Sequence, residues 1–453
     1  MSDTIAAVST GTQVCAIGIV RMSGGKAIEI ADRLFSPVSG RKMADCEDRK
    51  LIYGKLCDEQ GRLLDICLCT ISRAPNSYTG EDTAEFQCHG SPVVLRAVLE
   101  AAFGLGARQA LPGEFTKRAF LNGRMDLSGA EAVADIIDAE TAEAARNAAG
   151  QLGGAISRRI DEIYGALTDI SSHYHAVLDY PDEDIEDFTL ARYESDIDRC
   201  TAVLESLRAS YDSGKLLHSG VPAAIVGRPN AGKSSLLNAV LGYDRAIVTD
   251  IPGTTRDTIE EKLRLGGVLL RLTDTAGIRE TDDEIERMGV TRSRRAMEQA
   301  ELVLAVIDGH SEMTCEDLEL IKCAERAPHG IVILSKHDLG SLSKMPETTL
   351  PVIEISSVTG EGLDKLEATV RALFPMPAAP AGEILTNARQ FDAVSRALES
   401  MKAAGGAMRS GCTPDIVLTE TETAMAALQR SAKGRGRKGS EFVVSRYNDA
   451  RDF

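Results

Sequence analysis

A glycine-rich stretch that ends in lysine and serine has the residue types that hold phosphate groups. Gly227, Gly232, Lys233 and Ser234 follow the spacing G-x-x-x-x-G-K-[ST]. Glycines at these positions let backbone N–H groups turn toward phosphate oxygens, and a following helix adds the positive end of its dipole. Lys233 would reach the β- and γ-phosphates, and the Ser234 hydroxyl would hold Mg²⁺. The spacing therefore predicts a phosphate-binding loop, or P-loop.

The segments on either side of this loop have the pattern that the loop needs. Val221–Val226 predicts a short buried strand, and Ser235–Leu241 predicts the helix that follows. A chance glycine turn is the alternative. Strand, loop and helix in register disfavour that alternative.

Two polar segments follow at the places where a GTPase has its switches. Asp250–Asp257 contains threonines that can reach Mg²⁺ and sense the γ-phosphate. Asp274–Gly277 has the pattern D-x-x-G, in which Asp274 would hold Mg²⁺ through water and the Gly277 N–H would bond the γ-phosphate. Between the switches, Ile259–Leu265 and Val268–Leu272 predict a hairpin.

A base-reading segment completes the set of motifs. Ser335-Lys336-His337-Asp338 stands where guanine-binding proteins have N-K-x-D, after a predicted buried strand. Asp338 can accept hydrogen bonds from guanine N1–H and the exocyclic amine, so GTP is preferred over ATP. Ser335 replaces the usual Asn, and we expect the shorter side chain to weaken contact with the base and with the P-loop. The ordered motifs predict a GTPase.

The predicted nucleotide site thus draws on five segments of the chain. Its residues are Asn230, Ala231, Gly232, Lys233, Ser234, Ser235, Thr249, Asp250, Ile251, Pro252, Gly253, Thr254, Thr255, Asp274, Thr275, Ala276, Gly277, Ser335, Lys336, Asp338, Ser356, Ser357 and Val358.

The residue after the D-x-x-G motif raises a question about catalysis. Many such enzymes place a water-orienting Gln there, whereas this chain has Ile278. Asn230 could instead offer its side-chain oxygen to a monovalent cation, together with backbone carbonyls of the Thr249–Thr254 loop, and that ion would stabilise transition-state charge. Glu286 is a second candidate, as the group that orients the attacking water. Spacing alone favours an ordinary surface glutamate at that position.

Composition sets limits on the class of protein. A chain of 453 residues predicts two to four domains, and a net charge of −17 argues against a general nucleic-acid coat while leaving room for a local basic patch. The ten cysteines form no C-x-x-C pair; Cys67 and Cys69 would share one face of a strand, which is not a zinc spacing. The start of the chain has no signal-peptide pattern, and no apolar run approaches about 20 residues. We therefore expect a cytoplasmic protein with reduced thiols and no membrane span.

The remaining segments indicate how the domains are arranged. The first 120 or so residues predict an α+β domain, in which 76–82 and 112–124 are expected to be loops beside a pocket. Apolar residues recur at helical spacing on both sides of the P-loop region, in 127–178, 193–211, 387–404 and 415–430. The P-loop domain is therefore expected to be inserted into a helical domain, and helices from both sides would form one bundle.

The expected fold class is a multidomain α/β protein with an inserted P-loop GTPase domain. We expect domains at residues 1–122, 123–215 (helical, first part), 216–378 (GTPase) and 379–453 (helical, second part, with the tail).

With these motifs in place, the chain resembles the MnmE (TrmE) family of tRNA-modification GTPases. The segments that carry the resemblance are Asp3–Ala7, Gly18–Gly24, Asn76–Gly90, Pro112–Leu127 and Gly227–Asp257. The resemblance implies an N-terminal domain similar to folate-binding aminomethyltransferase domains. Arg21, Glu85 and Arg124 would match its folate-contacting positions. It also implies dimers through the N-terminal domains, and G domains that pair across GTP with K⁺.

The resemblance further implies roles and partners. Asn230, Thr249, Ile251 and Thr254 would hold K⁺, Ser234 and Thr255 would hold Mg²⁺, and Glu286 would orient water. A flavin- and NADH-using partner similar to MnmG (GidA), in a heterotetramer, would help to add an aminomethyl or carboxymethylaminomethyl group at C5 of the wobble uridine of certain tRNAs. A tetrahydrofolate derivative, 5-formyl or methylene, would supply the carbon.

The C-terminal residues depart from the family pattern. The family usually ends in Cys-x-Gly-Lys, whereas Ser431–Phe453 contains no cysteine and Cys412 lies outside such a motif. This departure does not affect the GTPase motifs, but it brings the modification activity into question. One alternative is therefore a GTP-driven scaffold that does not support modification. The other alternative is a ribosome-assembly GTPase of the Era or Der kind. That alternative predicts a basic RNA-binding module such as a KH domain. We find no G-x-x-G loop of that type, and the net acidic chain disfavours the alternative.

Overall fold

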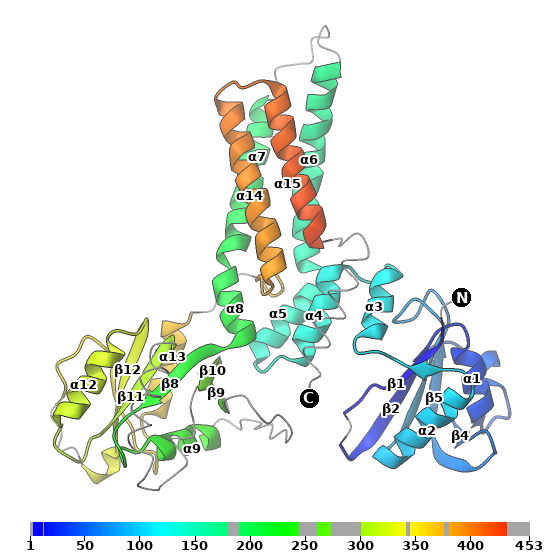
Figure 1. Ribbon diagram of the computed structural model, residues 1–453, viewed down its shortest axis with the longest axis horizontal. Coiled ribbons are helices and arrows are strands. Elements are labelled where there is room, and N and C mark those ends of the chain that lie inside the picture. Colours follow the sequence, from blue (N-terminus) through cyan, green and yellow to red (C-terminus); the bar gives the residue numbers. More distant parts are fainter. Residues whose placement is uncertain are drawn as a thin grey trace. The chain divides into compact units, whose positions relative to one another are not determined.

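The computed structural model describes residues 3–11, 13–179, 190–243, 261–272, 300–340, 345–375 and 380–432 (Figure 1). The chain divides into two compact units, one built on Met1–Ala134 and the other on Asp135–Leu428.

The N-terminal unit is built on a seven-stranded sheet in the order β3-β4-β5-β6-β2-β1-β7. All neighbours are antiparallel except β1 and β7. The strands are β1 (Ile5–Val8), β2 (Cys15–Ser23), β3 (Phe35–Pro37), β4 (Ile52–Cys57), β5 (Leu63–Ser72), β6 (Thr83–Gly90) and β7 (Arg108–Gln109). Together with helices α1 and α2, this sheet confirms the α+β class expected for the first 120 or so residues.

Side chains alternate between the two faces of this sheet, as the pleat requires. Helices α1 (Ala27–Leu34) and α2 (Pro92–Gly104) cover one face, where Val20, Met22 and Phe86 are fully buried. The opposite face carries Arg21 and Glu85. The sheet therefore separates an apolar core from a polar face, because neighbouring residues on one strand point to opposite sides.

The segment from Pro112 to Arg124 is largely a helix, so the expectation of a loop is wrong there. Helix α3 (Glu114–Leu121) begins at Glu114, and this carboxylate accepts hydrogen bonds from the backbone N–H of Leu111 and from the side chains of Arg108 and Arg118. An acidic residue in the first turn also suits the helix dipole. Helix α4 (Leu127–Ile137) follows.

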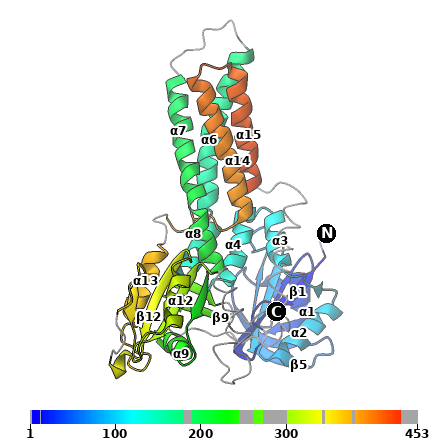
Figure 2. The same ribbon diagram turned by 60° about the vertical axis from the view of Figure 1, so that its left-hand side comes forward.

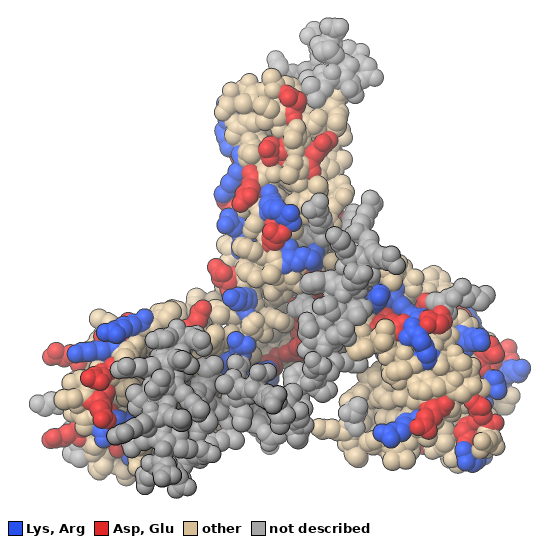
Figure 3. Space-filling model, viewed as in Figure 1, with Lys and Arg blue, Asp and Glu red and all other residues tan. Residues whose placement is uncertain are grey.

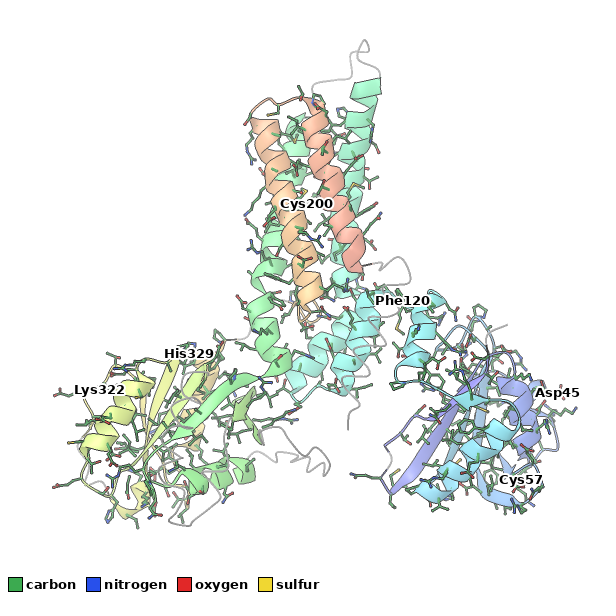
Figure 4. All side chains as sticks on the ribbon, in the orientation of Figure 1. Asp45, Cys57, Phe120, Cys200, Lys322 and His329 are labelled. Carbon is green, nitrogen blue, oxygen red and sulfur yellow. The ribbon has the colours of Figure 1, made fainter. Side chains whose placement is uncertain are left out.

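The helical part of the second unit is a bundle that takes helices from both ends of the chain. Its elements are α5 (Ala142–Leu152), α6 (Ala155–Asp179), α7 (Leu190–Ala209), α8 (Tyr211–Ser219), α14 (Ala388–Arg409) and α15 (Pro414–Ala432). Both Figure 1 and Figure 2 show α6, α7, α14 and α15 side by side. Apolar residues at helical spacing on α6 are buried in the bundle, and Ile156, Leu167 and Ile170 are fully buried. Cys200 of α7 is buried in the same bundle (Figure 4).

The chain leaves this bundle through α8 and returns along residues 380–387, which α5 and α8 hold. Asn147 donates to the Ile384 carbonyl at 3.1 Å and accepts from the Gly382 N–H at 2.9 Å. The Ser210 hydroxyl accepts from the Leu385 N–H at 3.0 Å. The segment that leads into the inserted domain is α8 itself, and the segment that leads out of it is bound to α5 and to the start of α8. Both connections of the inserted domain therefore lie at the same pair of helices, as expected of an insertion.

The inserted domain is a six-stranded sheet in the order β13-β12-β11-β8-β10-β9. The strands are β8 (Val221–Val226), β9 (Glu261–Leu265), β10 (Val268–Leu272), β11 (Leu302–Asp308), β12 (His329–Ser335) and β13 (Val352–Glu354). The β9–β10 pair is the predicted antiparallel hairpin, and the other neighbours are parallel. Helices α9 (Lys233–Tyr243), α12 (Cys315–Ala324) and α13 (Leu363–Leu373) pack on the sheet. Strand β8 matches its predicted range, and α9 begins two residues earlier than predicted.

Candidate nucleotide-binding site

The P-loop lies between β8 and α9, where the sequence places it. Asn230 has φ +62° and Gly232 has φ +93°, so the backbone takes the left-handed conformation twice within three residues. A side chain at Gly227 would lie 2.3 Å from the Val306 carbonyl oxygen, so only glycine lets the loop pass this close to β11. The loop thus has the tight turn and the helix N-terminus that phosphate binding requires.

Lys233 lies inside this loop. Its Nζ donates to the carbonyl oxygens of Gly227 and Arg228 at 2.7 and 2.8 Å. Burial lowers the pKa of this ammonium from its ordinary value. Ser234 lies on the exposed side of the first turn of α9, where a hydroxyl oxygen is a suitable ligand for Mg²⁺. These residues fit a nucleotide phosphate with Mg²⁺.

The base-reading segment follows β12 at the same end of the sheet. The Ser356 hydroxyl donates to Asp338 Oδ1 at 2.8 Å, which orients the carboxylate. Lys336 has φ +60°, and its Nζ lies 2.7 Å from Asp308 Oδ2. Asp338 is exposed, so its side chain is accessible to a base. Ser357 and Val358 lie beyond β13, and Val358 is 85% exposed.

Ser335 joins the base-reading segment to the P-loop. It is 2% exposed, and its Oγ lies 2.6 Å from the Ala231 carbonyl oxygen and 3.1 Å from that of Ile307. The short side chain therefore contacts the loop backbone directly, and the expectation that this contact is weaker than that of an Asn stays a prediction.

Several residues that support the site were not predicted from the sequence. Arg228 ties the P-loop to the start of α12, through Thr314 at 2.7 Å and Asp317 at 3.0 Å. Asp308 pairs with Lys336. Asp308 could have been found from the sequence, because it is a carboxylate at the end of a predicted buried strand. The partners of Arg228 could not, because they lie more than 80 residues further along the chain.

The structure leaves part of the predicted site undescribed. The following residues lie outside the described ranges: Thr249, Asp250, Ile251, Pro252, Gly253, Thr254, Thr255, Asp274, Thr275, Ala276, Gly277 and Glu286.

The N-terminal unit holds a second candidate site on the polar face of its sheet. Arg21 Nε donates to Glu85 Oε1 at 2.6 Å, from neighbouring strands. The guanidinium carbon lies 5.4 Å from the centre of the Tyr78 ring and 5.7 Å from that of Phe115. Charge, hydrogen-bonding groups and two aromatic rings thus converge, which suits a flat heteroaromatic ligand with amide-like edges. The aromatic residues were not singled out from the sequence.

Arg124 lies near the loop that contains Tyr78 and Gly80. A side chain at Gly80 would lie 3.3 Å from Arg124 Cγ and 2.9 Å from Asn122 Cβ, so glycine lets this loop and the end of α3 pack closely. Tyr78 hydrogen-bonds Thr116 of α3 at 3.0 Å. The three residues predicted to bind folate therefore lie on elements that share this corner of the unit.

An ionic network holds α3 in place. Arg118 contacts Glu81 at 2.9 Å and Glu114 at 2.9 Å, and it also contacts Asp3 at 2.8 Å. Burial of Glu114 opposes its ionisation, but hydrogen bonds from Arg108, the Leu111 N–H and Arg118 outweigh it and lower its pKa to about 2.

The surface charge of the bundle is mixed. Figure 3 shows Lys and Arg interspersed with Asp and Glu along the visible face of the described helices. Oppositely charged side chains of the bundle also form ion pairs, such as Arg409 with Asp198 at 3.0 Å and Lys402 with Glu205 at 2.6 Å. No helix among the described residues is long and apolar enough to cross a membrane.

The P-loop, the base-reading segment and the parallel sheet define a P-loop GTPase domain, inserted into a helical domain behind an α+β domain. The family descriptions "GTP-binding protein TrmE N-terminus" and "MnmE helical domain" match residues 4–124 and 127–433. The chain belongs to the MnmE family of tRNA modification GTPases.

Relatives cover nearly the whole chain. The tRNA modification GTPase MnmE of Roseiflexus sp. (strain RS-1) is 42% identical over 440 residues, which is 94% of each chain. That of Symbiobacterium thermophilum is 42% identical over 452 residues, or 98% of each chain, and that of Clostridioides difficile is 40% identical over 92% of each. Among solved structures, the G domain of the T. maritima FeoB iron transporter is 27% identical, covers 34% of this chain and 98% of that chain, and has a TM-score of 0.26.

Proposed function

We propose that this chain hydrolyses GTP as an enzyme of tRNA modification. The proposal of GTP hydrolysis depends most on the contact between the P-loop and the base-reading segment, which the Ser335 hydroxyl makes. Lys233 and the loop backbone would hold the phosphates, Asp338 would read guanine, and Ser335 fixes the distance between the two. Family membership supports the tRNA part, since the curated relatives are tRNA modification GTPases.

For hydrolysis we propose roles that depend on the residues outside the described ranges. Ser234 and Thr255 would hold Mg²⁺; Asn230, Thr249, Ile251 and Thr254 would hold K⁺; and Glu286 would orient the attacking water. The two ions would supply positive charge where negative charge develops in the transition state. The left-handed backbone at Asn230 supports this assignment, because it turns the residue out of the P-loop and leaves it exposed.

For the modification we propose that a tetrahydrofolate derivative, 5-formyl or methylene, binds on the polar face of the N-terminal sheet. Glu85 would accept hydrogen bonds from the N–H edge of the pterin. Arg21 would stay paired with Glu85, close to the rings of Tyr78 and Phe115. Arg124 would bind a carbonyl or carboxylate group of the ligand. The partners would be a second copy of the chain and an FAD- and NADH-dependent protein similar to MnmG, as a heterotetramer in the cytoplasm, with tRNA as substrate. We also propose the domain limits 1–122, 123–215, 216–378 and 379–453.

The first experiment is GTP turnover in KCl and in NaCl at equal ionic strength, with Lys233→Ala as the inactive control. Strong stimulation by K⁺ supports the ion assignment to Asn230. Equal rates in the two salts would contradict it and would require another catalytic group in place of the missing Gln. Glu286→Ala should lower turnover and spare GTP binding; unchanged turnover would remove the role given to Glu286.

A second experiment tests the tRNA part. Nucleoside mass spectrometry of tRNA from cells that carry this chain, or its Lys233→Ala variant, as the sole copy measures the C5 modification of wobble uridine. We expect the modification with the wild-type chain and its loss with the variant. Hydrolysis of GTP without modification would instead favour the scaffold, and a defect in ribosome assembly would favour the Era-like alternative.

A further inference from the structure

Two cysteines and an aspartate meet on the core face of the N-terminal sheet. Asp65 and Cys67 are two apart on β5 and therefore share a face. Leu68 pairs with Gln87 and Cys69 with Phe86, and continuing this register places Cys67 opposite Cys88 of β6. One ligand atom each of Asp65, Cys67 and Cys88 lies within 4.8 Å of the others. We propose that these three residues bind a thiophilic divalent cation of the Zn²⁺ type.

The ligand chemistry favours such an ion. Thiolates select zinc over the hard cations Mg²⁺ and Ca²⁺, and two thiolates with one carboxylate leave a fourth tetrahedral position for water. With Zn–S bonds of about 2.3 Å, two sulfurs on one zinc lie about 3.8 Å apart, so the three side chains need only small movements to close on an ion.

The surroundings supply what a metal site needs beyond its ligands. The His89 backbone N–H donates to Asp65 Oδ2 at 2.8 Å, and His89 Nδ1 lies 2.8 Å from Asp65 Oδ1. Burial of Asp65 opposes its ionisation, but these contacts outweigh it and lower its pKa, so the carboxylate is charged at neutral pH. Ligating carboxylates are commonly oriented by such hydrogen bonds.

The two cysteines are buried in the core of the unit, next to an exposed residue of β6. Cys67 and Cys88 are 6% and 2% exposed, whereas the His89 side chain is 76% exposed. The hydrogen bond with Cys67, followed by burial, raises the pKa of Cys88.

This site is distinct from the proposed folate site. Glu85 and Cys88 are three residues apart on β6, so their side chains point to opposite faces of the sheet. The cluster cannot be predicted from the spacing of its residues, because Cys67 and Cys88 are 21 positions apart and the strand register brings them together.

Cobalt binding to the full-length, metal-stripped protein tests the proposal, because cobalt bound to thiolates gives a charge-transfer absorption in the near ultraviolet. We expect this band to saturate at one equivalent of Co²⁺ and to disappear when Zn²⁺ is added. The band should be lost in Cys67→Ser and Cys88→Ser. It should persist in Cys69→Ser, a matched control that puts the same hydroxyl into the same strand and core.

A surface variant keeps the test independent of core folding. His89→Ala leaves the buried ligands in place and should weaken Co²⁺ affinity about 10- to 100-fold, as loss of a partner of a ligand does. Three results would overturn the proposal: no thiolate band in the wild type, an unchanged band in the two serine variants, or unchanged affinity in His89→Ala. A Cys67–Cys88 disulfide found by peptide mapping of the isolated protein would overturn it as well.

Discussion

The Ser335 hydroxyl lies 2.6 Å from the carbonyl oxygen of Ala231, so the base-reading segment and the P-loop are joined by one buried side chain. The Ser335 hydroxyl can donate to the carbonyl oxygen of Ala231 or to that of Ile307, and the closer one, Ala231, belongs to the P-loop. This hydroxyl is therefore one of the contacts that set the position of the loop relative to Asp338.

Ser335→Ala should weaken nucleotide binding. The substitution removes a hydrogen bond in a buried site, which costs about 1–2 kcal/mol, and lets the P-loop move relative to the base-reading segment. We expect the Kd for GDP to rise about tenfold, measured by fluorescence polarisation of a labelled nucleotide. Thr369→Ala, whose hydroxyl donates to the Lys365 carbonyl within α13 at 2.8 Å, is the control. An unchanged Kd in Ser335→Ala would show that the hydroxyl does not position the loop.

Asp338→Asn should change which base is bound. Asn keeps an oxygen for the Ser356 hydroxyl, so its amide nitrogen would face the base and could donate but not accept. Two hydrogen bonds from guanine to a carboxylate would be lost, at about 1.5–3 kcal/mol each, so GTP affinity should fall at least about 100-fold. Xanthosine triphosphate has a carbonyl in place of the amine and should bind more tightly than GTP.

Competition between the two nucleotides provides the measurement for this change. Asp364→Asn, on the exposed first turn of α13, is the matched control. Equal preference for GTP in wild type and Asp338→Asn would mean that Asp338 does not contact the base.

The sequence predicts those parts of the molecule that depend on local pattern. Strand β8 and the β9–β10 hairpin follow from short runs of apolar residues and paired glycines, and the insertion follows from helical periodicity on both sides of the P-loop. Helix α3 was missed because the partners that fix its first turn, such as Arg108, come from a separate strand. Asp308 beside Lys336 and Cys67 beside Cys88 likewise depend on strand order and register, which spacing along the chain does not contain.

Glu114 should make the N-terminal unit sensitive to acid. Its pKa of about 2 in the folded protein is lower than the ordinary value of 4.5 expected after unfolding. A lowered pKa stabilises the fold above pH 4.5, and this contribution is lost as the pH falls from about 5 toward 2. The difference corresponds to at most about 3 kcal/mol.

The comparison of Glu114→Gln with the wild type isolates this contribution. Denaturant unfolding should show the variant to be less stable at pH 7, with a gap that narrows by pH 3. Glu100→Gln, on the exposed side of α2, should follow the wild type at both pH values. A gap that is the same at pH 7 and pH 3 would mean that the charge of Glu114 does not stabilise the fold.

The same substitution in two helices of the bundle should have opposite effects. In α8, a methyl group at Gly214 would lie 1.9 Å from the Leu385 carbonyl oxygen, in the segment that returns from the G domain. In α6, Gly165 has open space around its Cβ position. Gly165→Ala should therefore stabilise the bundle by up to about 1 kcal/mol through helix propensity.

Gly214→Ala gains the same propensity but must push the Leu385 backbone away. That movement would break the hydrogen bond from the Leu385 N–H to Ser210, so we expect a net loss of about 1–3 kcal/mol. Thermal unfolding followed by circular dichroism measures both variants, with Tm raised for Gly165→Ala and lowered for Gly214→Ala. If both variants raise Tm, residues 380–387 are not seated against α8.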